Sequence, residues 1–149
     1  MKFSIVIPVL AAAVTIGGCA TSNTAPDDDI GAMLAAMSRG ESMVKGKDLE
    51  QAIAEADTQS LGSEKNPVRA QMPQGQRAYL ARLRCSDGAA PDFYRIGSFG
   101  VGVFGNIVDA YDVTCADGAT PEKTKVYMDM YHRGYVEDRP VPGFTIVEG

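Results

Sequence analysis

Residues 107–115 read IVDAYDVTC, a run in which apolar and polar side chains alternate. A period of two is typical of a half-buried β-strand, because successive side chains of an extended chain point to opposite faces. The face expected to be buried carries Ile107, Tyr111, Val113 and Cys115. This segment indicates that the C-terminal half of the chain forms a sheet.

Outward from this strand, residues 77–85, 94–104 and 125–131 are also predicted to be extended. In residues 77–85 one face carries Tyr79, Leu83 and Cys85. In residues 125–131 one face carries Val126, Met128 and Met130. The tail from Arg139 contains two prolines and is expected to wrap over the surface.

The N-terminal part shows the helical period instead. Apolar side chains recur at i, i+3, i+4 and i+7 in two stripes, the first formed by Ile30, Met33, Leu34 and Met37 and the second by Leu49, Ala52, Ile53 and Ala56. Asp48 and Gln51 are spaced as a capping box for the second helix. The methionines of the first stripe belong either to the core or to an adaptable binding groove.

Helices first and strands afterwards predict an α+β fold, with two N-terminal amphipathic helices packed on a small antiparallel sheet. We expect one domain over residues 29–149, helical over 29–60 and β-rich over 76–149. The formal net charge of -5 and the lack of a basic stripe argue against nucleic-acid binding.

The first residues combine one lysine with an uncharged run over residues 5–18, which is typical of a secretory signal peptide. The run ends in Ile16-Gly17-Gly18-Cys19, which resembles the lipobox of bacterial prolipoproteins. That resemblance implies a signal peptide over residues 1–18, cleavage before Cys19 and acylation of this cysteine. Residues 19–28 are then a flexible tether, and Ala20 after the cysteine favours the outer membrane, with the domain in the periplasm.

Two cysteines remain if Cys19 carries lipid, and an exported chain meets an oxidising compartment. Cys85 and Cys115 are therefore predicted to form a disulfide. Each lies in a nine-residue repeat, LRCSDGAAP at 83–91 and VTCADGATP at 113–121, at a strand end before an Asp-Gly turn.

A glycine-rich stretch, GVGVFG at 100–105, matches the spacing of a dinucleotide-binding fingerprint. That chemistry requires a strand before the motif and a helix after it, whereas here a strand follows. We therefore expect no cofactor and interpret the stretch as a bend in the sheet. A possible binding loop, where a peptide or glycan approaches bare backbone, comprises Gly97, Ser98, Gly100, Gly102 and Gly105.

Few residues suggest catalysis or metal binding. His132 is the single histidine and has no spare cysteine near it in a ligand spacing, so no metal site is predicted. Asp109 and Asp129 are candidates for a carboxylate pair acting on envelope glycan, provided that both face one cleft. No catalytic residue is assigned.

The leading hypothesis is a lipid-anchored, non-enzymatic binding or structural module whose partner is another envelope protein or cell-wall glycan. Its layout is similar to the small lipoprotein of the outer-membrane barrel-assembly machine, although the Gly-Met-Thr helix start of that family is absent. One alternative is a protein inhibitor, since Gly97-Ser98 resembles the serine-glycine loop of lysozyme-inhibitor lipoproteins. The other is a glycan hydrolase using Asp109 and Asp129.

Overall fold

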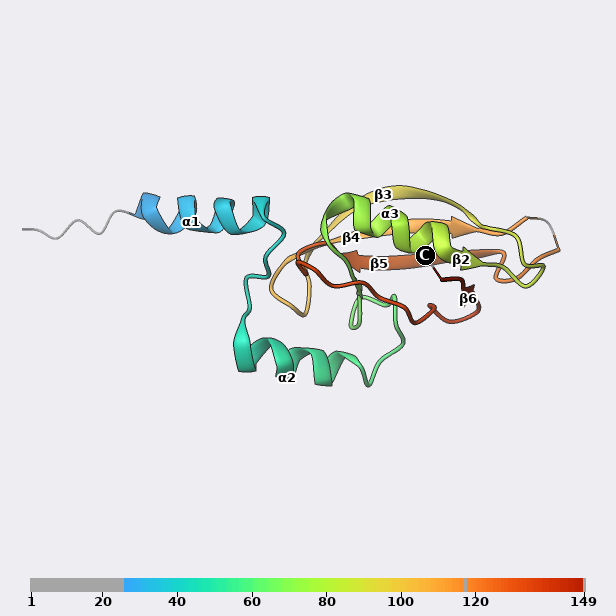
Figure 1. Cartoon of the computed structure of the whole chain (residues 1–149), viewed down its shortest axis with the longest axis horizontal. Helices are drawn as coiled ribbons and strands as arrows, with labels where there is room; N and C mark the ends of the chain where they lie inside the picture. The colour runs from blue at the N-terminus through green and yellow to red at the C-terminus, as the bar shows by residue number, and fades with distance from the viewer. Residues whose placement is uncertain (1–25, 117, 149) are drawn as a thin grey trace, which may run out of the picture.

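A computed structural model describes residues 26–116 and 118–148, and over these residues it shows three helices and two β-sheets (Figure 1). The helices are α1 (Pro26–Ser38), α2 (Gly46–Ala56) and α3 (Met72–Arg82). The strands are β1 (Val68–Arg69), β2 (Leu83–Arg84), β3 (Asp92–Val101), β4 (Ile107–Thr114), β5 (Lys123–Asp129) and β6 (Thr145–Ile146). The predicted α+β class is confirmed.

The main sheet has the order β1-β5-β4-β3. Its β3–β4 and β4–β5 pairs are antiparallel, but β1 pairs with β5 in parallel, so the sheet is mixed rather than purely antiparallel. The tail does fold back over the domain, and its strand β6 pairs with β2 in a second, two-stranded sheet. Two register shifts in β3 bend the strand on either side of Gly97 and Ser98.

Helix α3 covers one face of the main sheet, so the strand predicted over residues 77–85 is wrong as far as Arg82, and only Leu83–Arg84 of it is extended, as β2 (Figure 1). The buried side of this segment carries Gln76, Tyr79, Leu80 and Leu83, which is helical spacing. The helical pattern was hard to recognise in the sequence because its first position, Gln76, is polar, and polar residues are not expected on a buried face. In the structure its amide oxygen accepts a 3.0 Å hydrogen bond from the Tyr111 hydroxyl, which permits its complete burial.

The core lies between α3 and the sheet face beneath it. Val113, Val126 and Met128 are fully buried there, together with Leu80 and Leu83 of the α3 segment. Most of the exposed large apolar residues lie on α1, on β3 and in the turn that follows β3, and the others are Met43, Ile107, Val136 and Val147. The core cluster is thus built by α3, the sheet and tail residues such as Val141 and Phe144, and it contains no residue of α1 or α2.

The expected packing of both N-terminal helices on the sheet is not confirmed. Figure 1 shows α1 extending away from one end of the sheet, and Ile30, Met33 and Leu34 of its apolar stripe are exposed. Helix α2 buries Ala56 and half-buries Leu49 and Ile53. The physical reason is that α3 already occupies the apolar sheet face on which we expected these helices to lie.

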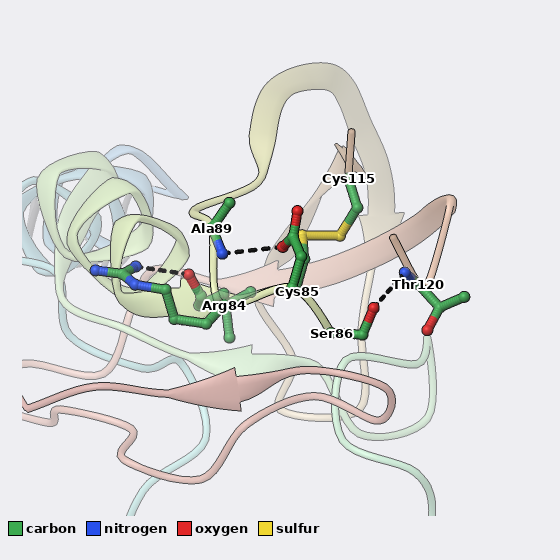
Figure 2. The surroundings of a disulfide bond; sticks show 8 residues. Arg84, Cys85, Ser86, Ala89, Cys115 and Thr120 are labelled. Carbon is green, nitrogen blue, oxygen red and sulfur yellow. Dashed lines mark hydrogen bonds between the residues drawn. A yellow bond between two sulfur atoms is a disulfide. The ribbon is translucent and has the colours of Figure 1, made fainter. Parts of the chain in front are cut away.

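The predicted disulfide is confirmed: Cys85 and Cys115 are bonded, with their Cα atoms 5.9 Å apart (Figure 2). The repeated segments lie side by side at this point. The Ser86 amide donates to the Thr120 carbonyl at 3.1 Å, and the Thr120 amide donates to the Ser86 hydroxyl oxygen at 2.9 Å. The bridge and these two bonds together hold the two turns against each other.

Candidate functional site

The glycine-rich segment forms the end of β3 and the turn into β4. Strand β4 begins at Ile107, directly after this turn, so no helix follows the segment and the structural context of a dinucleotide site is missing. Gly102 and Gly105 are tightly packed. A Cβ on Gly102 would overlap the Val108 side chain, and one on Gly105 would lie 2.8 Å from Val44 Cγ2. These two glycines of the predicted loop therefore have a packing role.

Gly97 and Gly100, by contrast, have open space where a side chain would stand. The backbone between Gly100 and Val103 borders a groove of about 400 Å³, lined also by Phe99 and Tyr127. The two rings meet edge to face with centroids 5.5 Å apart. We call this hollow the sheet groove. Of the five residues of the predicted binding loop only Gly102 lines the sheet groove, and the binding loop stays a prediction.

Ser98 of that loop is exposed, and its hydroxyl takes part in two hydrogen bonds. Its hydroxyl accepts a 2.7 Å hydrogen bond from Arg95 and donates to Asp109 Oδ1 at 3.1 Å. Arg95 also binds Asp109 directly at 2.7 Å. Ser98 therefore belongs to a polar cluster that holds the Asp109 carboxylate.

Asp109 and Asp129 do not face a common cleft. Asp109 is paired with Met128 and Asp129 with Val108 across β4 and β5, and paired residues share a face of the sheet. The two carboxylates therefore point to opposite faces. Both are buried, and Asp129 accepts hydrogen bonds from Asn106 Nδ2 and from the Tyr131 amide, each 2.9 Å long.

His132 is buried beside Asp129 rather than exposed. Its ring meets Phe104 edge to face at 5.0 Å, and Nε2 lies 3.4 Å from Asp129 Oδ2 without forming a hydrogen bond. Among the residues that the structure describes, no group of three or more His, Cys, Asp or Glu side chains is arranged to hold a metal ion.

A pocket of about 490 Å³ lies between α2 and the segments around β1 and residues 131–135, and we call it the α2 pocket. Its apolar wall is formed by Val44, Leu49, Ile53 and Tyr131. Its polar wall is formed by Glu41, Ser42, Lys45, Arg69, His132, Arg133 and Tyr135. The half-buried stripe of α2 therefore lines a pocket and does not fill the core.

The exposed apolar side chains gather where α1 approaches the β3–β4 turn. Met33, Met43, Val101 and Ile107 are exposed and line a pocket of about 200 Å³. Val101, which is 73% exposed, also lines the sheet groove together with the exposed Phe99 and Val103. We call these six residues the apolar patch. The patch is continuous because Val101 lines both the sheet groove and the smaller pocket.

Comparison of the chain with protein-family models, with curated proteins and with solved structures finds no match. Its function is therefore inferred from its own residues.

The sequence does not reveal the α2 pocket, because the residues that line it are scattered between positions 41 and 135. The one local signal was Arg69, a charged residue in the otherwise uncharged run NPVRAQMP at 66–73. A cation within such a run is expected to have a specific partner, because an unpaired buried charge is costly.

Cys19, the signal peptide over residues 1–18 and most of the tether over 19–28 lie outside the described residues. Within residues 26–116 and 118–148, no helix is both long and apolar enough to cross a bilayer. Lipid attachment at Cys19 therefore stays a prediction from the lipobox resemblance.

Proposed function

We propose that this chain is a lipid-anchored protein of the bacterial envelope whose α+β domain binds another envelope protein through the apolar patch. The observation that carries the binding role is the exposure of six large apolar side chains that share pocket walls. Contiguous exposed apolar surface on a soluble domain marks an interaction site.

The surroundings of the patch favour a protein as its partner. Charged residues of both signs border it, with Lys45 beside Met33 and Met43, and Glu64 and Lys65 beside Phe99. An apolar centre with a polar rim is the usual composition of a protein–protein interface. Residues 27–65 hold nine acidic and four basic residues, which disfavours direct contact of this region with anionic lipid.

The proposed anchor places the patch close to a membrane. Six residues separate Cys19 from Pro26, where α1 begins, and the seven Cα–Cα steps between these two residues span at most about 25 Å in an extended chain. A lipid on Cys19 would hold α1 within that reach of the bilayer. The proposed partner is therefore a protein of the same membrane, which the lipobox context suggests is the outer membrane, with the domain in the periplasm.

Site-specific photo-crosslinking in intact cells tests the binding role. A photoreactive amino acid at Val101 or Met33 should yield a discrete adduct with one other protein, and the Val101 adduct should be lost in Met43→Asp. The same group at Ala81, which is exposed on α3, should give none. Equal adducts from Ala81, or none from either patch position, would count against the patch as the contact surface.

The anchor is tested separately. Mass spectrometry of the N-terminal peptide should find lipid on Cys19 and no residues before it, and Cys19→Ser should remain uncleaved. An unmodified cysteine would remove the anchor from the proposal. The crosslinking experiment would still test the binding role, in that case for an exported protein that carries no lipid.

A further inference from the structure

The α2 pocket contains a buried positive charge without a carboxylate partner. Arg69 is only 7% exposed, and its guanidinium lies 4.3 Å from the Tyr135 ring centroid while Nη2 donates to the Tyr135 hydroxyl at 3.0 Å. In the described part of the chain, no Asp or Glu oxygen lies within 4.0 Å of it. Arginine cannot shed its proton in a protein, so this charge persists.

The nearest carboxylate along this path is already occupied. The Tyr135 hydroxyl donates to Glu137 Oε2 at 3.1 Å, but Arg139 binds both oxygens of Glu137, at 2.9 and 3.0 Å. Arg69 Nε and Nη1 form no hydrogen bond within the described residues. Neither atom is among the fully buried polar atoms that lack a hydrogen bond, so both keep some access to solvent. Arg69 is also one of the residues that line the α2 pocket.

The N-terminus of α2 provides a second, independent feature. Lys45 is the N-cap of this 11-residue helix and makes no side-chain capping bond, and both Lys45 and Gly46 line the pocket. The predicted capping box is wrong, since the Gln51 amide donates to Glu55 at 2.9 Å instead. The first amide groups of α2 are thus left without a side-chain cap, and the helix dipole favours an anion at this end.

Two acids lie near these groups, Asp48 in the first turn of α2 and Glu41 on the pocket wall. Glu41 lies 3.5 Å from both Lys45 Nζ and Arg133 Nη1, and its closest ion pair is with Arg39 at 2.8 Å. The hydrogen bond from Arg39 lowers the pKa of Glu41 to about 2, so it is ionised at neutral pH. Lys45, Arg69 and Arg133 against Glu41 leave two net positive charges on the pocket wall, without counting His132.

We propose that the α2 pocket binds a small organic oxyanion, a carboxylate or phosphate carried on an aliphatic body. The oxyanion accepts hydrogen bonds from Arg69 and the uncapped N-terminus of α2. The aliphatic body lies against Leu49 and Ile53, which form the apolar wall. A volume of about 490 Å³ lies within the usual range of small-molecule sites, and this pocket combines an apolar wall with convergent polar groups. None of the six residues of the apolar patch lines this pocket, although Lys45 borders both, and the proposed anion site does not depend on the patch.

Calorimetric titration of the purified full chain tests the site with four probes. Hexanoate and hexyl phosphate each carry an oxyanion on an aliphatic chain, 1-hexanol lacks the charge, and inorganic phosphate lacks the aliphatic body. At least one of the first two should bind measurably tighter than both of the others. The tighter of the two assigns the head group as carboxylate or phosphate.

Variants locate the binding. Arg69→Gln should weaken the better probe about tenfold or more, as expected for loss of a charge-assisted hydrogen bond. Lys45→Gln, at an exposed position, should weaken it less. Arg77→Gln removes the same charge from the exposed side of α3 and should leave affinity unchanged. A melting curve of each variant checks folding, and Lys45→Gln serves as the test if Arg69→Gln does not fold.

Three results would overturn the proposal. Equal binding of 1-hexanol and the two oxyanions would show that charge is not recognised. Unchanged affinity in both Arg69→Gln and Lys45→Gln would place the ligand elsewhere. The absence of heat for every probe at millimolar concentration would show that the pocket has no oxyanion site.

Discussion

Asp109 and Asp129 stand on neighbouring strands yet point to opposite faces of the sheet, because the first is paired with Met128 and the second with Val108. A glycosidase pair must flank one bond, with the two carboxyl groups about 5 to 9 Å apart in one cleft. Each aspartate is itself buried and instead accepts hydrogen bonds within its own cluster, partly exposed around Asp109 and buried around Asp129. Structural support is the role that the geometry assigns to both.

Asp129→Asn should therefore lower the free energy of unfolding by about 1–3 kcal/mol, because the new amide would face the Asn106 donor inside the protein. Urea titration measures the change. Asp87→Asn is the matched control, since Asp87 is exposed in a turn and an asparagine oxygen can still accept from the Ala89 amide. If Asp129→Asn were as stable as the wild type, and the wild type hydrolysed glycan while the variant did not, the hydrolase alternative would be favoured instead.

Three strands, both N-terminal helices and the disulfide were predictable because each depends on local spacing or on chemistry that few residues can supply. The strand predicted at 107–115 is β4, and the helix predicted from the Ile30 stripe is α1. The strand prediction for residues 77–85 failed because the apolar residues Tyr79, Leu83 and Cys85 also fit the two-residue period of a strand. Only Gln76, a buried polar residue, completes the helical pattern, and its burial depends on Tyr111 from a distant strand.

The α2 pocket could not be predicted, because its charge arises from residues brought together by the fold. Arg69 is buried and lies in β1, whose two-residue parallel pairing with β5 is too short to leave a pattern in the sequence. The missing cap of α2 was also hidden, since Asp48 and Gln51 have capping-box spacing but lie inside the helix.

Replacing a core leucine of α3 should cost far more than replacing a leucine of α1. Leu80 is 0% exposed, so Leu80→Ala should destabilise the protein by about 2–5 kcal/mol through lost burial and the remaining cavity. Leu34 is 57% exposed, and Leu34→Ala should change stability by less than about 0.5 kcal/mol. Chemical denaturation of both variants measures the difference. Equal losses would mean that α1 packs on the core in solution.

Acid should destabilise the protein partly through Glu137. Burial alone would raise the pKa of this carboxyl, but hydrogen bonds from Arg139 outweigh burial and hold the pKa below its ordinary 4.5. Its stabilising contribution is therefore complete above pH 4.5 and is lost as the pH falls through the lower pKa of the folded state.

The check is the unfolding free energy measured between pH 3 and pH 7. Glu137→Gln should be less stable at pH 7 and should lose part of the decline seen in acid. Glu50→Gln removes an exposed carboxylate of α2 and should keep the full decline. An unchanged acid limb in Glu137→Gln would show that other carboxylates dominate this pH range.

Gly102 should not tolerate a side chain, whereas Gly31 should. A Cβ on Gly102 would overlap the Val108 side chain at the base of the sheet groove, and small-to-large changes in packed sites cost about 1–3 kcal/mol. Gly31 lies within α1 and has nothing within 4 Å, so Gly31→Ala should be neutral or stabilising by up to about 1 kcal/mol. Thermal unfolding of the two variants distinguishes a packed turn from a mobile loop.

Loss of the Cys85–Cys115 bridge should destabilise the domain without unfolding α3 first. The bridge closes a loop with a sequence separation of 30, and the chain-entropy model assigns such a loop roughly 3.7 kcal/mol. The double variant Cys85→Ser, Cys115→Ser should approach this loss, measured by urea unfolding against the oxidised wild type. Hydrogen exchange should rise first at the two turns joined through Ser86 and Thr120, because they would keep only their two hydrogen bonds. Equal stability of the double variant and the wild type would show that those bonds and the surrounding core already restrain the loop.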